Sequence, residues 1–295
     1  MSNITAGMVK ELRERTGSGM MECKKALTET NGDLEAAVEL MRKAGLAKAD
    51  KKSGRTAAEG CVCCKSSADG KRAAIVEINS ETDFVAKGDD FVEFANLVAQ
   101  TALESNANTL EELLEVKIPS TGATIEETRR SMVAKIGENI AVRLFERFAA
   151  PEGSVASYLH GSRIGVLVEL TGGDAELGRD IAMHVAASKP ACVDETGVDP
   201  EIVEKEKAIF SAQAEASGKP ANVIEKMVEG RVKKFLGEIT LVGQPFVKDP
   251  DQTVAQLLAN KGAKVARFVR LEVGEGIEKV ESNFAEEVMA QVRAS

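Results

Sequence analysis

Two stretches of closely similar sequence constrain the fold of this chain more than any other feature. They are Arg72-Ala-Ala-Ile-Val-Glu-Ile78 and Arg163-Ile-Gly-Val-Leu-Val-Glu-Leu170. Each follows another β-prone run and a turn, and Asp-Gly between two such runs is a strong signal for a β-hairpin. The preceding runs and turns are Cys61–Ser66 with Ala68-Asp69-Gly70, and Val155–Leu159 with His160-Gly161-Ser162. Because two copies are too few for a solenoid, they predict a duplicated α+β core of small antiparallel sheets and helices.

Amphipathic helix patterns follow both hairpins. Apolar residues recur at helical spacing from Phe91 to Ala99 and again from Leu177 to Ala186. Aromatic residues make up only 4% of the chain, with no Trp and one Tyr, so the cores must be built from Ala, Val, Leu, Ile and Met. Further helices are predicted over Leu110–Val116, Ile125–Leu144, Thr253–Asn260 and Phe284–Val292, and an alternating strand over Val265–Val273.

The first 45 residues predict three short helices. Thr5 can cap the first, which ends at Gly17, and the second runs from Met20 to Thr30. Asp33 caps the third, which is predicted to end at Gly45. The Lys-rich stretch Ala47–Arg55 lacks apolar periodicity and is predicted to be a solvated linker.

A helical hairpin is predicted between the second hairpin region and the C-terminus. Asp199-Pro200 is a good cap followed by a proline in the first turn, and Gly218-Lys219-Pro220 separates two charged helices. Their narrow apolar seam favours a hairpin that protrudes from the core. The predicted division is a three-helix head with linker at 1–55, core subdomains at 56–152 and at 153–197 with 238–276, the helical hairpin at 198–237, and a C-terminal helix module at 277–295.

Composition and missing motifs exclude several functions. The net charge of -9 disfavours broad nucleic-acid binding, which depends on Lys and Arg at phosphates. No phosphate-loop motif is present, Gly274-Glu275-Gly276 lacks the third glycine of a dinucleotide fingerprint, and no Ser or Cys lies in a nucleophile elbow. We therefore expect no enzyme activity, no cofactor and no direct nucleotide binding. Met1–Lys10 has no apolar leader and no run reaches the roughly 18 apolar residues of a membrane span, so we expect a soluble cytoplasmic protein.

The cysteines and histidines offer little metal chemistry. Five cysteines without a secretory leader argue against a disulfide framework. Cys61, Cys63 and Cys64 have no paired ligands elsewhere, and strand alternation places them on both faces, so they are interpreted as strand cysteines rather than a zinc site. His184 lies in an apolar helix pattern and is interpreted as a core histidine.

The segment Asn79–Lys87 contains the most unusual combination of residues. Directly after a predicted strand it places Asp83 beside the large ring of Phe84, in a chain with few aromatics. One interpretation is structural, with Thr82 or Asp83 capping the next helix and Phe84 packing as a staple. The other is an exposed wedge, in which the ring opens a gap in a partner and the carboxylate disturbs a metal ion or its waters.

Several motifs, in order along nearly the whole chain, resemble those of the bacterial elongation factor Ts family. Thr82-Asp83-Phe84-Val85 is the most specific of them, although Gly88 stands where the family often has Asn. The others are Leu12-Arg-Glu-Arg-Thr-Gly17, Met20-Met21 with Cys23-Lys-Lys-Ala-Leu27, Ile181-Ala-Met-His-Val-Ala-Ala-Ser-Lys-Pro190, Gly243-Gln-Pro-Phe-Val247 and Val273-Gly-Glu-Gly-Ile277.

The resemblance implies a fold and a function. The family has a ubiquitin-associated-like (UBA-like) head, two related core subdomains, a coiled-coil hairpin and a C-terminal helix. Its members promote GDP release from the GTPase elongation factor Tu, so that GTP can load during polypeptide elongation. By resemblance, Asp83 and Phe84 would intrude near the Mg²⁺ site of that partner, and Thr82 and Val85 would position them. Leu12, Arg13, Met20, Met21 and His160 would make further contacts with it. The alternative for Leu12 and Met20 is that they belong to the core of the three-helix head.

Two other functions are compatible with parts of the sequence. A helical adaptor would use the three-helix head but leave the duplicated core without a role. An RNA-binding translation factor would depend on the basic run Lys48–Arg55, which a solvated linker explains better. Self-association through the duplicated core is also left open.

Overall fold

The computed structural model describes residues 4–216 and 220–278. Its N-terminal head consists of α1 (Ala6–Thr16), α2 (Met20–Glu29) and α3 (Leu34–Lys52). As predicted, the Thr5 hydroxyl accepts a hydrogen bond from the amide of Met8 at 3.3 Å, and Gly17 ends α1 in the left-handed conformation. The head core is small and lies apart from the rest; its buried members are Val9, Leu12, Cys23, Ala26, Leu27 and Ala37.

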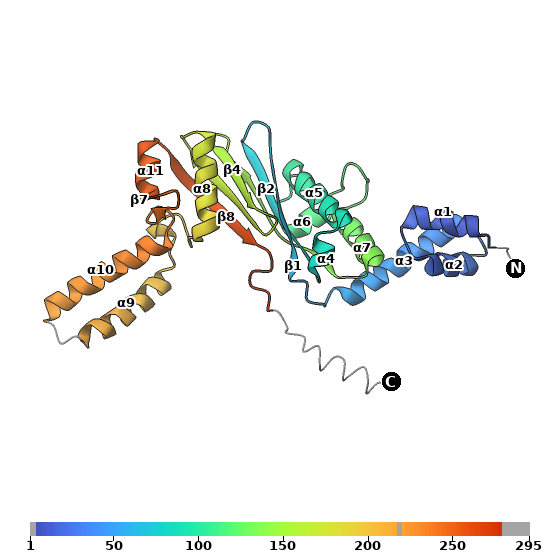
Figure 1. Cartoon of the computed structure of the whole chain (residues 1–295), viewed down its shortest axis with the longest axis horizontal. Coiled ribbons are helices and arrows are strands. Elements are labelled where there is room, and N and C mark those ends of the chain that lie inside the picture. The colour runs from blue at the N-terminus through green and yellow to red at the C-terminus, as the bar shows by residue number, and fades with distance from the viewer. Residues whose placement is uncertain (1–3, 217–219, 279–295) are drawn as a thin grey trace.

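The predicted end of the third helix at Gly45, and the linker after it, are wrong. Helix α3 continues to Lys52 and reaches from the head to α7 (Ile125–Ile136) (Figure 1). Gly45 is buried where the two helices meet, and a Cβ at this position would lie only 2.9 Å from the Cβ of Ala134. The glycine therefore permits close helix packing, and ion pairs from Arg42 and Asp50 to α7 hold the extended helix in place.

The first sheet has the order β1-β2-β3 and is antiparallel throughout. β1 (Glu59–Ser66) and β2 (Arg72–Ser80) form the predicted hairpin. The helix predicted over Ile125–Leu144 is wrong, because α7 ends at Gly137, whose φ is 88°, and β3 (Ile140–Ala149) follows. One face of this sheet packs on α5 (Asp89–Glu104), α6 (Leu110–Leu114) and α7.

The second sheet has the order β4-β5-β8 and repeats the hairpin arrangement. β4 (Ser154–His160) and β5 (Ile164–Thr171) form the hairpin, and β8 (Lys264–Glu272) is the third strand. Its outer face packs on α8 (Ala175–Ser188) and α11 (Val254–Asn260). In the chain, α11 directly follows a small ribbon of β6 (Pro245–Phe246) and β7 (Asp249–Thr253).

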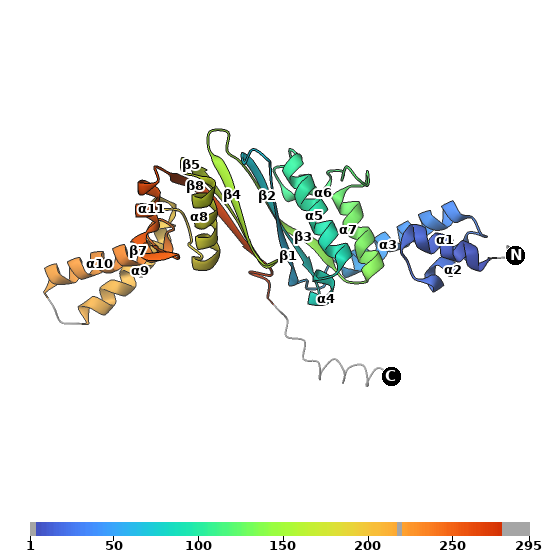
Figure 2. The same ribbon diagram turned by 45° about the horizontal axis from the view of Figure 1, so that its top comes forward.

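The two sheets pack against each other, so the core has four layers: helices, sheet, sheet, helices (Figure 2). The sheets lie close together at Gly165, where an added Cβ would lie 2.5 Å from Val62 and 2.9 Å from Ile75. The predicted α+β class and both hairpins are thus confirmed. The predicted helical hairpin is present as α9 (Pro200–Glu215) and α10 (Ala221–Ile239), which extend from the core at the end opposite the head (Figure 1). The helix predicted over Phe284–Val292 lies outside the described residues.

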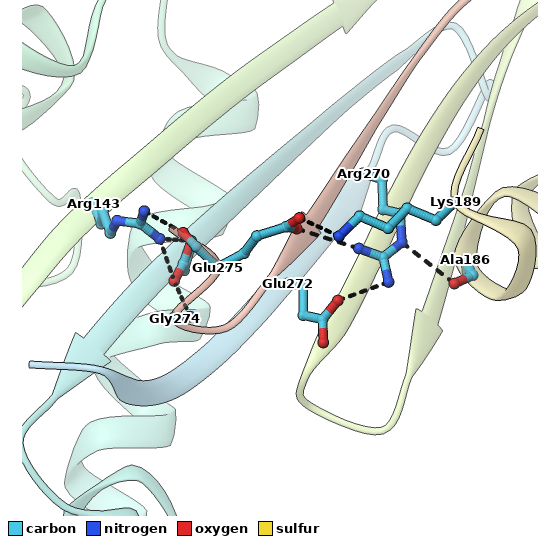
Figure 3. Close-up of polar contacts among 8 residues, drawn as sticks. Arg143, Ala186, Lys189, Arg270, Glu272, Gly274 and Glu275 are labelled. Carbon is cyan, nitrogen blue, oxygen red and sulfur yellow. Dashed lines mark hydrogen bonds and ion pairs between the residues drawn. The ribbon is translucent and has the colours of Figure 1, made fainter. Parts of the chain in front are cut away.

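A charged network joins the two sheets at the segment that follows β8 (Figure 3). A β-bulge in β3 leaves Arg143 without a register partner on β2, and its guanidinium binds the buried carboxylate of Glu77 at 3.0 and 3.1 Å. The amide of Gly274 also donates to Glu77, at 2.8 Å. Glu275 accepts from Arg143 through its carbonyl and forms ion pairs with Lys189 and Arg270 through its carboxylate. Residues of both subdomains therefore meet at the Val273–Ile277 motif.

Candidate partner-binding site around Asp83 and Phe84

The Thr82-Asp83-Phe84-Val85 segment forms a single exposed turn directly after β2. Helix α4 (Asp83–Ala86) has only four residues, and the Thr82 hydroxyl caps it by accepting a hydrogen bond from the amide of Val85 at 3.4 Å. Val85 packs against the first core, whereas the Phe84 side chain is 84% exposed. The capping part of the structural interpretation is confirmed, and the packing part is wrong, because Phe84 does not act as a staple.

Asp83 carries its charge at the surface of this turn. Its carboxylate accepts a hydrogen bond from the ammonium group of Lys87 at 2.6 Å, one helical turn away. This bond and the nearby positive charge lower the pKa of Asp83 below its ordinary value. An ionised carboxylate and an exposed aromatic ring are therefore carried by adjacent residues, and the carboxylate interacts with a solvent-exposed lysine and with backbone amides of the turn.

A groove of about 550 Å³ runs beside the turn and is shared with the second hairpin. Its lining includes Thr82, Asp83 and Phe84 from the turn and Ser162 and Arg163 from the second hairpin. The junction is fixed by the amide of Val62, which donates to the carbonyl of Ser162 at 2.8 Å, and by the ion pair of Arg163 with Glu59 at 3.1 Å. The groove gives the turn an open flank against which a partner could fit.

His160 lies at the end of β4, two residues before Ser162, and is exposed. Its Nδ1 is 3.3 Å from the hydroxyl of Tyr158, and the two rings are tilted by 32°. The tip of the second hairpin and the Asp83–Phe84 turn therefore belong to neighbouring parts of the same core surface.

The head residues are not brought to this groove. Met20 and Met21, 59% and 77% exposed, begin α2, and Arg13 is exposed on α1. The length of α3 separates them from α4 (Figure 1). Leu12 is fully buried in the head core, where it supports the helices that carry Arg13 and the two methionines. Its contact with a partner stays a prediction.

The residues that hold the turn were missed by sequence reasoning. Both carboxylate oxygens of Glu138 accept hydrogen bonds from Thr82, across a separation of 56 residues. Glu81 in turn accepts from the amide of Asn139 at 2.6 Å. No spacing rule connects these positions; only the Gly137 helix stop could have indicated that a loop begins there.

The cysteine cluster is divided between the two faces of β1. Cys61 and Cys63 share one face with their sulfur atoms 3.9 Å apart, and Cys64 faces the other sheet, where burial raises its pKa to about 12. Among residues 4–216 and 220–278, no three His, Cys, Asp or Glu side chains are grouped so that they could hold a metal ion. Within the same ranges, no helix is both long enough and apolar enough to span a membrane.

Comparison with known proteins assigns the family. The family model described as Elongation factor TS matches residues 81–275, so the match begins at the turn itself. The chain belongs to the elongation factor Ts family. It is 76% identical to elongation factor Ts of Methylococcus capsulatus over 99% of this chain and 100% of the relative. It is 65% and 64% identical to the proteins of the same name from Alkalilimnicola ehrlichii and Thioalkalivibrio sulfidiphilus, over 99% of this chain and 99% of each relative.

In this member of the elongation factor Ts family, His184 is a core residue, as predicted. It is fully buried, its Nδ1 accepts a hydrogen bond from the amide of Val247 at 3.1 Å, and its Nε2 lies 2.9 Å from the side-chain oxygen of Gln244. These partners require a neutral ring with its proton on Nε2. Burial, opposed by the hydrogen bond to Gln244, lowers the pKa of His184.

We expect this histidine to make the protein less stable in mild acid. Because the folded-state pKa is below the unfolded value of about 6.5, the unfolded state binds the proton more readily, and the free energy of unfolding falls as pH drops below about 6.5. The slope contributed by one proton is at most about 1.4 kcal/mol per pH unit. Urea unfolding between pH 7.5 and 5.5 measures it. The chain has two histidines, so His160→Gln is the matched control: it should keep the slope, and His184→Gln should remove it. Equal slopes in both variants would contradict the assignment.

Proposed function

We propose that this chain is a guanine-nucleotide exchange factor for elongation factor Tu, and that Asp83 and Phe84 are the groups that loosen GDP. The observation that carries the proposal is the α4 turn. It presents an ionised carboxylate and an aromatic ring that is 84% exposed, on a backbone braced by the core. A ring this exposed offers apolar area that a partner can cover on binding, which is favourable in proportion to the area removed from water.

The proposed mechanism is thermodynamic coupling. GDP in a GTPase is held by backbone amides and a lysine around its phosphates, together with Mg²⁺. A factor that inserts a ring and a negative charge near that site binds best when Mg²⁺ and GDP are absent. By linkage it must then weaken GDP by the same factor by which GDP weakens it. No covalent bond is made or broken, so the chain acts as an exchange factor and not as an enzyme.

The remaining residues receive positioning or docking roles in this proposal. Thr82 caps the turn and Val85 anchors it, so both set the direction of Phe84. His160 would dock a second part of the GTPase beside the groove. Arg13, Met20 and Met21 would dock a third part from the head, where two large methionine side chains are exposed together.

Release of a fluorescent GDP analogue from elongation factor Tu tests the function directly. With excess unlabelled GDP, addition of this protein should accelerate the release in proportion to its concentration until the rate saturates. A release rate that does not change over the whole concentration range would reject the proposal.

The linkage predicts that GDP and Mg²⁺ together dissociate the complex. Calorimetry should give an affinity for nucleotide-free elongation factor Tu at least tenfold higher than for the GDP–Mg²⁺ form, which corresponds to about 1.4 kcal/mol or more. Phe84 and Asp83 account for this difference if they compete with the Mg²⁺ site. GDP without Mg²⁺ is the matched control and should weaken the complex less. An affinity indifferent to both ligands would show that the protein binds elsewhere.

A further inference from the structure

Thr82 is hydrogen-bonded to the loop between α7 and β3. Glu138 accepts two hydrogen bonds from Thr82: its Oε2 lies 3.0 Å from the amide nitrogen and its Oε1 lies 2.8 Å from the hydroxyl oxygen. A carboxylate bound at both oxygens by one residue fixes that residue in distance and in orientation, and such charge-assisted bonds are stronger than neutral ones.

Hydrogen bonds run in both directions between the segment Glu81–Thr82 and the α7–β3 loop, and we call this set of bonds the clasp. Glu81 accepts from the amide of Asn139 at 2.6 Å, and its other oxygen pairs with Arg55 at 3.0 Å. The side-chain amide of Asn139 donates to the carbonyls of Ser53 and Arg55, at 3.3 and 2.7 Å. The clasp thus joins the start of α4, the α7–β3 loop and the chain that leaves α3.

The turn needs an external support of this kind. A helix of four residues is far shorter than the roughly 12 residues that a helix needs for marginal stability in water. Phe84 contributes no packing that would hold it, since its side chain is 84% exposed. Val85 and Ala86 pack on the first core, and the Ser80 hydroxyl donates to the Thr82 carbonyl at 2.9 Å. Glu138 adds two charge-assisted hydrogen bonds at Thr82, the residue that begins the turn.

We propose that Glu138 is a positioning residue of the exchange reaction: it holds the Asp83–Phe84 turn in one conformation before the partner arrives. This inference rests on the proposed exchange function. Without Glu138 the turn must become ordered during binding. The entropic cost of that ordering reduces the binding free energy that is available to displace GDP. Glu138 itself touches neither nucleotide nor metal in this proposal, and it acts only through Thr82 and the residues that follow it.

A double-mutant cycle on fluorescent-GDP release tests the proposal, with the specificity constant for catalysed release as the measured quantity. Glu138→Ala should lower it about fivefold in the otherwise unaltered chain. In a chain that already carries Phe84→Ala, the same substitution should lower it less than twofold, because the ring that Glu138 positions is gone and only Asp83 remains to be positioned. Equal factors in the two backgrounds, or no effect in the unaltered chain, would overturn the proposal.

Two further variants separate positioning from loss of the fold. Thr82→Val removes the hydroxyl that both binds Glu138 and caps α4 but keeps the Thr82 amide, and it should reproduce part of the effect. Glu152→Ala, at an exposed glutamate in the β3–β4 turn, should leave release unchanged. Amide hydrogen exchange should become faster over Thr82–Lys87 in Glu138→Ala while β2 keeps its protection; loss of protection across β2 as well would assign Glu138 a general structural role and overturn the proposal.

The design also separates this proposal from the function on which it rests. If the unaltered protein does not accelerate GDP release, or if Phe84→Ala is as active as the unaltered protein, the proposed function or its site is wrong. If Phe84→Ala is impaired and Glu138→Ala is not, only the positioning role of Glu138 is wrong.

Discussion

Replacing Phe84 by alanine should slow catalysed GDP release at least tenfold and leave the fold intact. The ring is 84% exposed, so its loss removes almost no packing from the free protein, and stability should change by less than about 0.5 kcal/mol. Covering a phenylalanine side chain at an interface is worth about 1.5–3 kcal/mol. Because about 1.4 kcal/mol corresponds to a factor of ten in rate, the expected loss is roughly ten- to a hundredfold.

Stopped-flow measurement of fluorescent-GDP release, with the urea-unfolding midpoint as the test of folding, checks this expectation. Leu144→Ala is the matched control, since it also truncates an exposed apolar side chain, 38% accessible, but on β3. It should leave release within twofold of the unaltered protein. Unchanged release by a folded Phe84→Ala variant would remove the ring from the mechanism. The same assay on Asp83→Asn then ranks the carboxylate against the ring.

Local signals in the sequence were sufficient for the hairpins and most helix ends. Asp-Gly, as in Asp69-Gly70, is a pair that favours a tight hairpin turn. Thr5 caps the start of α1 and Gly17 its end, both through interactions within a few residues. Such features depend on neighbouring residues, so a single sequence contains them. The same holds for Thr82 as a cap, which was predicted as one of two alternatives.

The errors arose where a distant contact decides the local structure. A glycine such as Gly45 is a typical signal for the end of a helix. Here the helix continues, and the glycine is needed because Ala134, far away in sequence, packs against this position and leaves no room for a side chain. At Gly137, a helix and a strand with similar apolar content follow each other with only a short loop between them, so their combined pattern was interpreted as one helix.

In the candidate site, too, local features were predicted and features that depend on distant contacts were not. The sequence combination of Asp83 and Phe84 indicated where a partner could bind, because both residues stand in one motif. It did not decide between a packed and an exposed Phe84, and it did not indicate that Glu138 holds Thr82, since that support comes from the distant α7–β3 loop. The second hairpin borders the groove for a similar reason: the packing of the two sheets, and not sequence proximity, brings Ser162 there.

The second large effect is expected at Glu77, in the network that joins the two sheets. Its carboxylate is fully buried and accepts from Arg143 at 3.0 Å, from Asn79 at 2.9 Å and from the amide of Gly274 at 2.8 Å. Glu77→Ala leaves a partly buried guanidinium without its charge partner and a backbone amide without an acceptor. Removing one member of a buried ion pair typically costs about 3–5 kcal/mol, so we expect the free energy of unfolding to fall by that amount.

Urea unfolding of Glu77→Ala beside Glu146→Ala measures this cost. Glu146 is an exposed glutamate on β3, three residues after Arg143, and its replacement should change stability by less than about 0.5 kcal/mol. Glu77→Gln should lie between the two, because the amide keeps an acceptor oxygen for Gly274 but loses the charge opposite Arg143. If the Glu77 network does not stabilise the contact between the two sheets, Glu77→Ala will lower the free energy of unfolding no more than Glu146→Ala does. A loss of several kcal/mol, with Phe84→Ala unaffected in the same experiment, would instead show that the segment after β8 closes the core, whereas Phe84, in the turn that directly follows β2, does not contribute to its stability.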